Sequence, residues 1–390
     1  MEKDRAADGL RGMAALAVFF QHFFLTFYPG GFQHFFPWVA APGAPSGWAE
    51  KILQLPFVSA LVSGGLPVCI FFVLSGYVLT RQYARSGSLD ALRSLAGRRY
   101  LRLGIPVFAS IMLSYGLFCL GPYQVGAVAR ITGSAWLTSQ SIQGQPGFLD
   151  ALKDGLYGAI FLGRVGLNTP LWTLRVEFIG SMLIFAYSAL AWPGKRGVIS
   201  AALYLAMIYF YAPQEWPYYL AFLIGSYLGN AHFKLGGWAS AGSVLLALYL
   251  SSMDGSPMFA WLHVLPFEPG IVVALCHVLA GSLIVMVARY GTFGGMLTLR
   301  PVQFLGRISY PLYLVHIPIL MTLGCGVFLS IEAGSIRSLA VAATLLATLA
   351  MVILVAWMFE RYVDQPAIRL SRLLVRHEQR NPRVAADLSS

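Results

Sequence analysis

The chain has 390 residues, of which 57% are hydrophobic and only 11% are charged, and its formal net charge is +11. Soluble domains usually carry about 25% charged residues, so this composition excludes an ordinary soluble enzyme and predicts a polytopic membrane protein. The 27 Lys and Arg residues are concentrated in short segments between apolar runs. That distribution is typical of cytoplasmic loops, and we therefore expect a lipid bilayer rather than nucleic acid as the partner.

Ten apolar runs of membrane-spanning or nearly spanning length follow one another, at residues 10–28, 57–80, 102–121, 169–192, 198–212, 217–230, 238–252, 270–289, 303–329 and 337–359. They predict an all-α fold, a polytopic membrane helix bundle of about ten transmembrane helices. An even number of spans places both termini on one side. With the termini inside, all but six of the 27 Lys and Arg residues fall on the cytoplasmic side, which predicts an N-in, C-in orientation. The six expected outside are Lys51, Arg130, Lys153, Arg164, Arg175 and Arg337.

The segments between these runs predict the domain organisation. Residues 29–56 are rich in Gly and Pro and form an expected outer loop, and residues 122–168 form a second one, in which 148–163 suits a short interfacial helix. We expect residues 1–366 to form one transmembrane domain and residues 367–390 a basic cytoplasmic tail that rests on anionic lipid. The first apolar run lacks a small-residue cleavage site, so it should be retained. The four cysteines form no CxxC motif, and no metal site is expected.

The first apolar run carries two polar residues that share a helix face. Arg11 and His22 are eleven positions apart, which on an α-helix is three turns plus about 20°, with roughly 16 Å between them along the axis. A fixed cation at one depth and a titratable nitrogen at another suit a long ligand with an anionic head. The alternative is that Arg11 reaches the lipid headgroups and His22 is an interfacial polar group.

Two further groups of polar residues lie near the second and third runs. Ser75 and Gly76 form a small-residue pair of the kind that allows close helix packing. Arg99 and Arg102 lie three residues apart, so on a helix they share a face and can grip a phosphate with both guanidiniums. Charge that only fixes the topology explains such a cluster equally well.

The fourth and ninth runs contain polar groups at membrane depth. Arg175 and Glu177 lie within the fourth run, where charge is either functional or paired with a neighbouring helix. His316 lies in the ninth run beside Pro318, whose missing N–H frees a backbone carbonyl. The imidazole either donates to that carbonyl or belongs to a site.

In chain order, these residues resemble the motifs of the membrane-bound acyltransferase-3 family. The resemblance runs from Asp8 to Pro366, nearly the whole chain, and its motifs are weak singly but specific as an ordered set. They are Arg11-x10-His22, Phe71-Phe72-x-x-Ser75-Gly76, Arg99-x-x-Arg102, Leu171-Trp172-Thr173-Leu174-x-x-Glu177, Ser309-Tyr310-x-Leu312-Tyr313-Leu314-x-His316-x-Pro318, and the closing pair Glu360 and Pro366.

The resemblance implies an integral membrane O-acyltransferase in the inner (plasma) membrane. Such an enzyme moves an acyl group, acetyl by default, from cytoplasmic acyl-CoA to a hydroxyl of a cell-surface glycan or a lipid-linked sugar. Acyl-CoA is then a co-substrate, and no other cofactor is expected. The family often has Ser at the positions of Thr173 and Pro311, departures that bear on the choice of acceptor. Some members carry a fused extracytoplasmic domain, which we do not expect here.

The resemblance also assigns roles to the polar residues. Arg11, Arg99 and Arg102 would hold the phosphates or pantetheine of the donor, and His22 would act as general base or carry the acyl group. Glu177 would orient His22 or the acceptor, and His316 would bind the thioester carbonyl. The remaining substrate-binding candidates are Ser75, Trp172 and Tyr313.

Two other classes of protein fit the same residues. A transporter or channel would use the intramembrane charges as an ion or proton path, and a non-catalytic receptor would bind acidic lipids at the basic inner face. Release of free CoA thiol from acetyl-CoA distinguishes the enzyme from both, because neither rival consumes a thioester.

Overall fold

The computed structural model describes residues 4–55, 57–121, 123–140, 142, 144–191, 196–253, 257–332, 334 and 336–380. All regular secondary structure in these ranges is helical, and the only strand-like pairing there is an isolated bridge between Ala40 and Ser134. The prediction of an all-α fold is therefore confirmed.

Every predicted apolar run overlaps a helix, although the helix of the second run begins only at Gly65 and that of the third already at Leu89. In chain order these are α1 (Arg5–Phe27), α4 (Gly65–Ser86), α5 (Leu89–Leu120), α9 (Trp172–Ala191), α10 (Arg196–Tyr211), α11 (Trp216–Leu228), α12 (Gly237–Ser251), α13 (Pro269–Tyr290), α14 (Arg300–Ile319) and α16 (Arg337–Phe359). Six helical stretches in the described part of the chain are long and apolar enough to cross a membrane, which makes this a multi-pass membrane protein. Ten crossings and the N-in, C-in orientation stay predictions.

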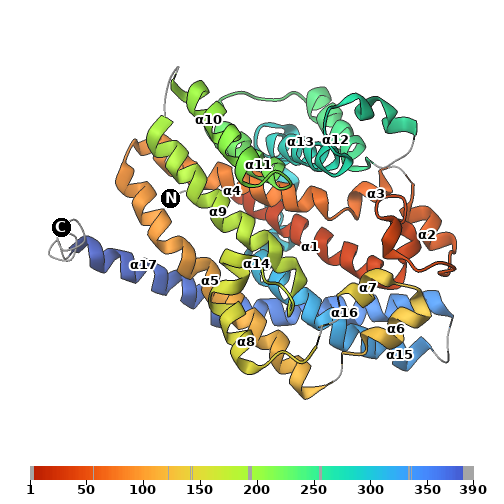
Figure 1. Ribbon diagram of the computed structural model, residues 1–390. Coiled ribbons are helices and arrows are strands. Elements are labelled where there is room, and N and C mark those ends of the chain that lie inside the picture. Colours follow the sequence, from red (N-terminus) through yellow and green to blue (C-terminus); the bar gives the residue numbers. More distant parts are fainter. Residues whose placement is uncertain are drawn as a thin grey trace.

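Shorter elements connect these helices. They are η1 (Pro29–Phe32), η2 (Pro37–Val39), α2 (Trp48–Leu53), α3 (Val58–Leu61), α6 (Val125–Thr132), α7 (Ala135–Ser139), α8 (Phe148–Lys153), η3 (Asp154–Leu162), η4 (Thr169–Leu171), η5 (Pro257–Val264), η6 (Thr292–Thr298), η7 (Leu320–Gly324), α15 (Cys325–Glu332), η8 (Glu360–Asp364) and α17 (Gln365–Arg380). Figure 1 shows the N-terminus and α17 at one end of the bundle, and α2, α6 and α15 at the other. We call these the N-terminal end and the distal end.

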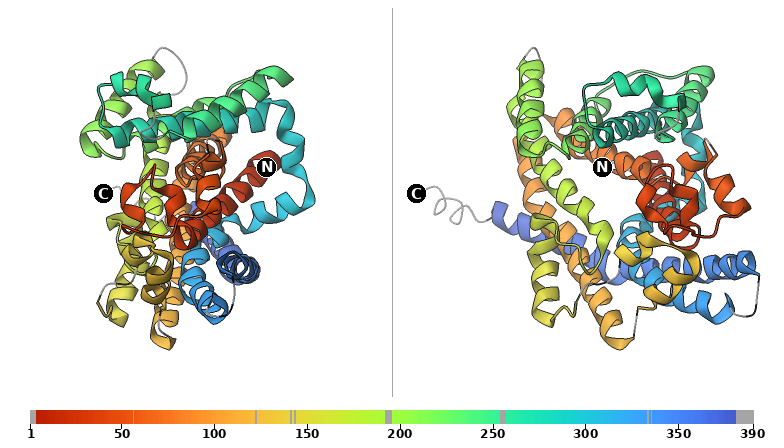
Figure 2. Two further views of the ribbon diagram at one scale, coloured as in Figure 1. Left: turned by 90° about the vertical axis from the view of Figure 1, so that its right-hand side faces the viewer. Right: turned by 45° about the vertical axis from the view of Figure 1, so that its right-hand side comes forward.

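Helix α1 lies between the two halves of the bundle. Its distal residues belong to an apolar cluster shared with α5, α14 and α16, and its first turns belong to a second cluster shared with α4, α9, α11 and α13. Both views of Figure 2 show this arrangement, with the green helices α10–α13 on one side of α1 and the blue helices on the other. Arg11 and His22 are therefore carried by an element that each half of the molecule contacts.

Glycines allow the central helices to touch backbone to backbone. A Cβ added at Gly306 of α14 would lie 2.3 Å from the carbonyl oxygen of Asp8 in α1, and one at Gly76 of α4 would lie 2.0 Å from the carbonyl oxygen of Phe222 in α11. Only glycine fits at such approaches, which is the usual way in which membrane helices pack closely. The packing role expected for the Ser75-Gly76 pair is thus fulfilled by Gly76.

Pro318 explains where α14 changes its winding. Proline has no N–H to donate to the carbonyl four residues earlier, and that carbonyl, of Leu314, instead accepts hydrogen bonds from Ser110 and Asn168, each at 2.8 Å. The helix then continues through the π-helical η7 into α15. His316 does not donate to the freed carbonyl, because two other side chains occupy it.

The segment 148–163 differs from the short interfacial helix that we expected. It is helical, but it packs lengthwise against α5, with Phe148 beside Tyr115 and Phe161 beside Tyr100. The chain then returns, so that Asn168 bonds to Ser110 of α5 at 2.8 Å. A Cβ at Gly155 would lie 2.8 Å from the Phe108 ring, so glycine permits this close packing. The segment therefore lies along α5, and composition alone does not distinguish this path from an interfacial helix.

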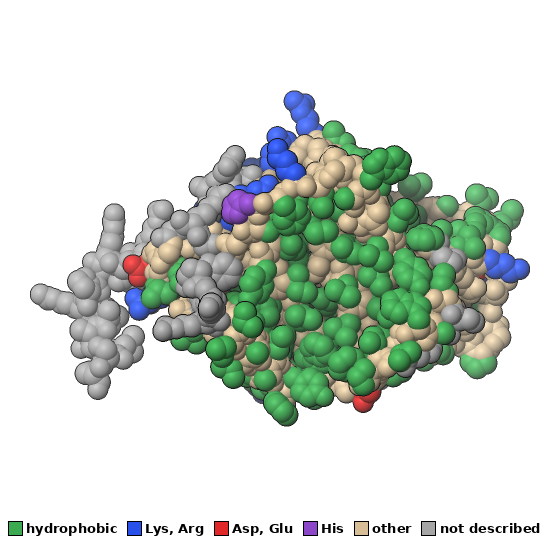
Figure 3. Space-filling view, turned by 90° about the horizontal axis from the view of Figure 1, so that it is seen from above, with side chains coloured by type: hydrophobic (Ala, Val, Ile, Leu, Met, Phe, Trp, Pro, Cys, Tyr) green, Lys and Arg blue, Asp and Glu red, His purple; other side chains and the backbone are tan. Residues whose placement is uncertain are grey.

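The outer surface of the bundle suits contact with lipid. Figure 3 looks onto the side formed by α10–α13 and shows hydrophobic side chains over most of it, with charged side chains mainly at its edges. Val198 and Phe210 of α10 are among the exposed apolar residues, at 73% and 83%. At the C-terminal end of the chain, α17 exposes Arg369 and Arg372, which are two of the residues predicted for the basic tail. Residues 381–390 of that tail lie outside the described residues.

Candidate active site

Four arginines converge on one cavity near the N-terminal end of the bundle. This arginine cavity has a volume of about 330 Å³, and α1, α4, α5, α9, α14 and the start of α17 contribute to its walls. Its polar lining residues are Asp8, Arg11, Ser75, Arg99, Arg102, Thr173, Glu177, Arg307, Ser309, Tyr310, Tyr313, Asp364 and Gln365. Cations outnumber carboxylates in this lining, so the cavity is suited to an anionic group.

The four arginines are not equivalent. Arg99 is buried and forms an ion pair with Glu177, while its Nε donates to Ser181 at 2.9 Å. Glu177 also accepts a 2.6 Å hydrogen bond from Ser75. Arg102 forms no ion pair with the described residues, and Arg11 lies 3.5 Å from Asp8. Arg99 therefore has a structural partner, whereas Arg102 leaves its donors available to a ligand.

A second cavity contains His22 and opens toward the distal end. This histidine cavity has a volume of about 780 Å³, and among its described lining residues there is no Asp, Glu, Lys or Arg. Its walls are rich in aromatic side chains, including Phe35, Trp38, Trp136, Trp172 and Tyr218. Such a lining suits an uncharged ligand that offers a broad apolar face and a few hydroxyl groups.

His22 and His316 form a hydrogen-bonded pair whose proton positions follow from its surroundings. Nδ1 of His316 lies 2.7 Å from the carbonyl oxygen of Tyr313. Because a carbonyl only accepts, we assign the His316 proton to Nδ1, which leaves Nε2 as an acceptor. Nε2 of His316 lies 2.9 Å from Nδ1 of His22, so Nδ1 of His22 is the donor. The lone pair of His22 is thereby left on Nε2, which forms no hydrogen bond with the described residues.

Packing holds the His22 ring in place from its other side. The Trp136 ring of α7 lies nearly parallel to the His22 ring, with the centroids 5.3 Å apart, and the His316 ring meets His22 edge to edge, with the centroids 5.1 Å apart. His316 itself is fully buried, while His22 lines the cavity. A ring fixed in orientation with one free basic nitrogen is the arrangement that a general base requires.

The two cavities meet at Tyr313 and Val68. Both side chains line both cavities. The Tyr313 hydroxyl lies 2.7 Å from Thr173 Oγ1 and 2.7 Å from the carbonyl oxygen of Pro170. This tyrosine is therefore held by α9 and η4 at the boundary between the arginines and His22.

The structure groups the predicted site residues differently from the sequence-based scheme. Glu177 lies in the arginine cavity with Arg99 and Ser75 rather than beside His22, and Trp172 lies in the histidine cavity, 5.6 Å from the Tyr218 ring. His316 lies behind His22, where its ring nitrogens already have partners. Arg175 pairs with Glu215 at 3.1 Å, which is the interhelical ion pair that we gave as its alternative.

Several lining residues were not among the sequence candidates. Arg307 and Asp364 line the arginine cavity, and His277, whose Nε2 lies 3.4 Å from Ser63 Oγ, lines the histidine cavity with Trp136. Arg307 lies two residues before Ser309, close enough for the ninth-run motif to have drawn attention to it. Trp136 comes from a connecting segment, and no spacing relates it to His22. No group of three or more His, Cys, Asp or Glu side chains that would hold a metal ion occurs in the described ranges.

Comparison with known proteins agrees with the resemblance found in the motifs. The family model described as an acyltransferase domain matches residues 4–361. The chain is 26% identical to the O-acetyltransferase PaAT-1 of Phomopsis amygdali over 435 aligned positions, which cover 94% of this chain and 83% of that protein. No solved structure matches. Since the family model spans almost all of the chain, the protein belongs to the acyltransferase-3 family of membrane O-acyltransferases.

Proposed function

We propose that this protein transfers an acyl group, acetyl by default, from cytoplasmic acyl-CoA to a hydroxyl of a cell-surface glycan or a lipid-linked sugar. The observation that carries the proposal is the position of His22. His22, with its free Nε2, lines one cavity. Among the described residues, only Tyr313 and Val68 are shared with a second cavity, which holds four arginines. A donor with an anionic head and a long thioester arm fits this pair of cavities.

The arginine cavity supports the assignment of the donor. Arg102 and Arg11 offer guanidinium donors to the phosphates or to the polar pantetheine arm. Arg99 contributes charge and holds Glu177, and this pair shapes the wall. From Arg11 the axis of α1 leads over roughly 16 Å to His22, so an extended arm whose head is bound at Arg11 brings its thioester toward the histidine.

The chemical step that we propose uses His22 Nε2 as the base. Nε2 removes the proton of the acceptor hydroxyl, the oxygen attacks the thioester carbonyl, and the carbon–sulfur bond breaks. The CoA thiolate leaves and takes the proton from the His22 imidazolium, so the products are an ester and free CoA thiol. His316 is a positioning residue in this scheme, because it accepts from Nδ1 of His22 and so directs the lone pair to the reacting side.

The lining of the histidine cavity supports an uncharged acceptor. Sugar rings present hydroxyl groups at their edges and C–H groups on their faces, which match polar side chains such as Gln21 and aromatic ones such as Trp38 and Trp172. An acceptor bearing a carboxylate or phosphate near the reacting hydroxyl would meet no cation among these lining residues. We place the enzyme in the inner (plasma) membrane, where donor and acceptor approach from opposite sides.

The test measures thiol release from acetyl-CoA by purified protein in lipid nanodiscs, with and without a surface-glycan fraction as acceptor. Loss of a general base typically costs about 10²–10⁴-fold, so His22→Asn should abolish measurable transfer, with unchanged thermal stability and acetyl-CoA binding. Arg11→Ala should weaken donor binding while His22 remains able to act as the base. Transfer by His22→Asn at more than about a tenth of the wild-type rate would contradict the mechanism, and a wild-type protein that consumes no thioester would contradict the function.

A further inference from the structure

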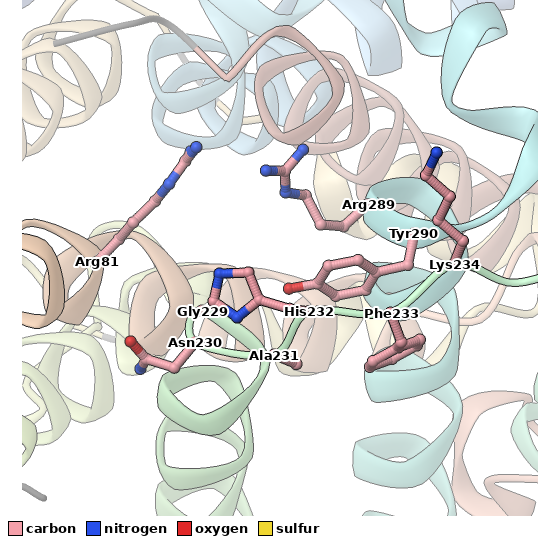
Figure 4. Close-up of a pocket in the computed structure, with 9 residues that line it drawn as sticks. All are labelled: Arg81, Gly229, Asn230, Ala231, His232, Phe233, Lys234, Arg289 and Tyr290. Carbon is pink, nitrogen blue, oxygen red and sulfur yellow. The ribbon is translucent and has the colours of Figure 1, made fainter.

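A basic pocket lies at the N-terminal end of the bundle, apart from both cavities of the proposed enzyme. It has a volume of about 580 Å³, and the segment 229–234 between α11 and α12 forms one wall. The other wall is formed by Arg81, in the C-terminal part of α4, and Arg289, near the end of α13. Figure 4 shows both arginines extending into the same space, with the rings of His232 and Tyr290 beside it and Lys234 at its edge. We call this the basic pocket.

The wall formed by 229–234 is a built structure rather than a loose connection. The amide of Leu235 donates to the carbonyl oxygen of Tyr290 at 2.8 Å, and the rings of Phe233 and Tyr290 lie 4.5 Å apart. The Tyr290 hydroxyl donates to the carbonyl oxygen of Leu228. Asn230 donates to Ser226 at 2.8 Å. Contacts at both ends of the segment therefore hold the pocket open with its polar side chains around it.

The charges around this pocket are not balanced. Asp4 lies 2.8 Å from Arg81 and 3.7 Å from Arg289, and it is the carboxylate that both arginines share. Although burial opposes it, the hydrogen bond from Tyr77 and the two arginines hold the pKa of Asp4 below its usual value, so Asp4 is charged at neutral pH. Lys234 forms no ion pair with any described residue. Among the described residues, one carboxylate is thus shared by the two arginines and Lys234 adds a third cation, so a net positive charge remains.

The basic pocket and the arginine cavity share no lining residue in the described part of the chain. Asp4 contacts the arginines of the pocket, while Asp8 and Arg11, farther along α1, line the arginine cavity. The first turn of α1 therefore separates the two. The basic pocket is not part of the donor site proposed above.

We propose that the basic pocket binds a phosphate-bearing ligand, which is either the headgroup of an anionic lipid or a free phosphate. Two guanidiniums and an ammonium around one space match the oxygens of a phosphate group, to which arginine donates in pairs. The position of the pocket relative to the membrane also suits a lipid headgroup. Arg81 and Arg289 lie near helix ends, and Trp238, at the start of α12, is 95% exposed, as expected near the lipid interface. Basic pockets between helix ends on the cytoplasmic side of a membrane, where we expect the N-terminal end of this bundle, are typical headgroup sites.

The lipid source is tested by native mass spectrometry of protein released from nanodiscs of phosphatidylcholine with added phosphatidylglycerol. The wild type should retain phosphatidylglycerol, and the double variant Arg289→Gln with Lys234→Gln should retain it roughly tenfold less, as expected for the loss of charge-assisted hydrogen bonds. The control is the double variant Arg300→Gln with Arg93→Gln, which removes the same charge at the N-terminal end of the bundle. Both arginines are exposed and do not line the pocket. It should retain as much lipid as the wild type.

The free-phosphate source is tested in phosphatidylcholine nanodiscs with inorganic phosphate as the probe. If the ligand is soluble, phosphate should raise the melting temperature of the wild type and of the control, and not that of the double variant. Lys234→Gln alone, an exposed change with no ion pair to break, shows whether a loss is due to misfolding. A positive result in either arm supports the proposal and identifies the source. Equal lipid retention and equal phosphate response in wild type and both pocket variants overturn it.

Discussion

His316 affects the proposed chemistry only through His22. The Tyr313 carbonyl fixes the proton of His316, and His316 in turn fixes the proton of His22. Replacement of His316 by Phe keeps a buried ring but removes the acceptor, so His22 Nε2 is no longer held as the free base. Since a misplacement of about 1 Å can cost about 100-fold, we expect His316→Phe to lower kcat by about 10- to 100-fold while the KM for acetyl-CoA changes little.

A conservative variant distinguishes positioning from packing at His316. The amide oxygen of a Gln side chain can reach the position of His316 Nε2 and accept from His22 Nδ1, so His316→Gln should recover part of the kcat lost in His316→Phe. Steady-state kinetics in nanodiscs with acetyl-CoA provide the measurement. If the two variants lose activity equally, or if the donor KM rises with the fall in kcat, His316 contributes packing or donor binding rather than orientation.

Arg99 and Arg102 share a helix face but differ in their partners. Arg99 is buried against Glu177 and Ser181, whereas Arg102 pairs with no described residue and lines the cavity. A lysine keeps the charge but loses the planar fork that binds phosphate through two donors. We therefore expect Arg102→Lys to raise the KM for acyl-CoA by on the order of tenfold, roughly the loss of one charge-assisted hydrogen bond.

Arg99→Lys is the matched comparison for that experiment. It disturbs a buried ion pair, so its main effect should be a lower melting temperature. Donor KM measured for both variants, together with thermal unfolding in detergent, separates the two roles. An unchanged donor KM in Arg102→Lys would leave this arginine as charge that only fixes topology.

At the scale of helices, the contact between α1 and α14 sets the positions of both histidines. The helices touch at Gly306, where an added Cβ would meet the Asp8 carbonyl at 2.3 Å. Backbone cannot yield as a flexible side chain does, so Gly306→Ala must push the helices apart. Overpacking typically costs about 1–3 kcal/mol, and we expect a clearly lower melting temperature together with reduced acyl transfer, because the His22–His316 hydrogen bond joins the same two helices.

Gly326 provides the control for that substitution. It lies on α15, which continues from α14, and an added Cβ there would meet no atom within 4 Å. Gly326→Ala should therefore leave the melting temperature unchanged or raise it slightly, since alanine favours helix more than glycine does. Equal melting temperatures for the two alanine variants would show that the α1–α14 contact is looser than the structure describes.

The helices were more predictable from the sequence than their contacts. Apolar length locates α1, α13 and α16 closely because every backbone polar group in lipid must be satisfied within a helix. Composition does not distinguish the segment 148–163 as an interfacial helix from one that packs along α5, since both expose apolar faces. Its path depends on Gly155 fitting against Phe108, which is a tertiary contact.

In the candidate site, too, the contacts between side chains could not be predicted from the sequence. Helical spacing brings Arg11 and His22 to one face, and a motif draws attention to His316. No local pattern determines how α1 and α14 rotate about their axes, and so none predicts that His22 and His316 touch or that Trp136 packs against His22. The prediction that Glu177 orients His22 required a particular rotation of α9, which the sequence does not determine. In the structure the Glu177 carboxylate pairs with Arg99 instead.

The whole molecule places its cavities along one direction. Arg11 and the other arginines lie toward the end that holds the N-terminus and α17, and the histidine cavity is lined by residues of η1, η2 and α7 at the distal end (Figure 1). A cytoplasmic donor and an acceptor at the outer leaflet require this order. If the chain were inserted the other way round, the arginine cavity would face away from the cytoplasm and the proposed function would be impossible.

Cysteine labelling tests that orientation directly. Cys119 is the exposed one of the four free cysteines, so Cys119→Ser provides the background. Lys51→Cys on α2 and Thr292→Cys on η6 replace exposed residues at the distal and N-terminal ends. The ten predicted spans would put all but six of the 27 Lys and Arg residues on the same side as the N-terminus, so by the positive-inside rule we expect that side to be cytoplasmic. A membrane-impermeant maleimide should label Lys51→Cys in intact cells and Thr292→Cys only after permeabilisation. Labelling of both from one side would contradict the seven crossings that the ten predicted spans put between residues 51 and 292. The reverse pattern would put the arginine cavity outside, out of reach of cytoplasmic acyl-CoA.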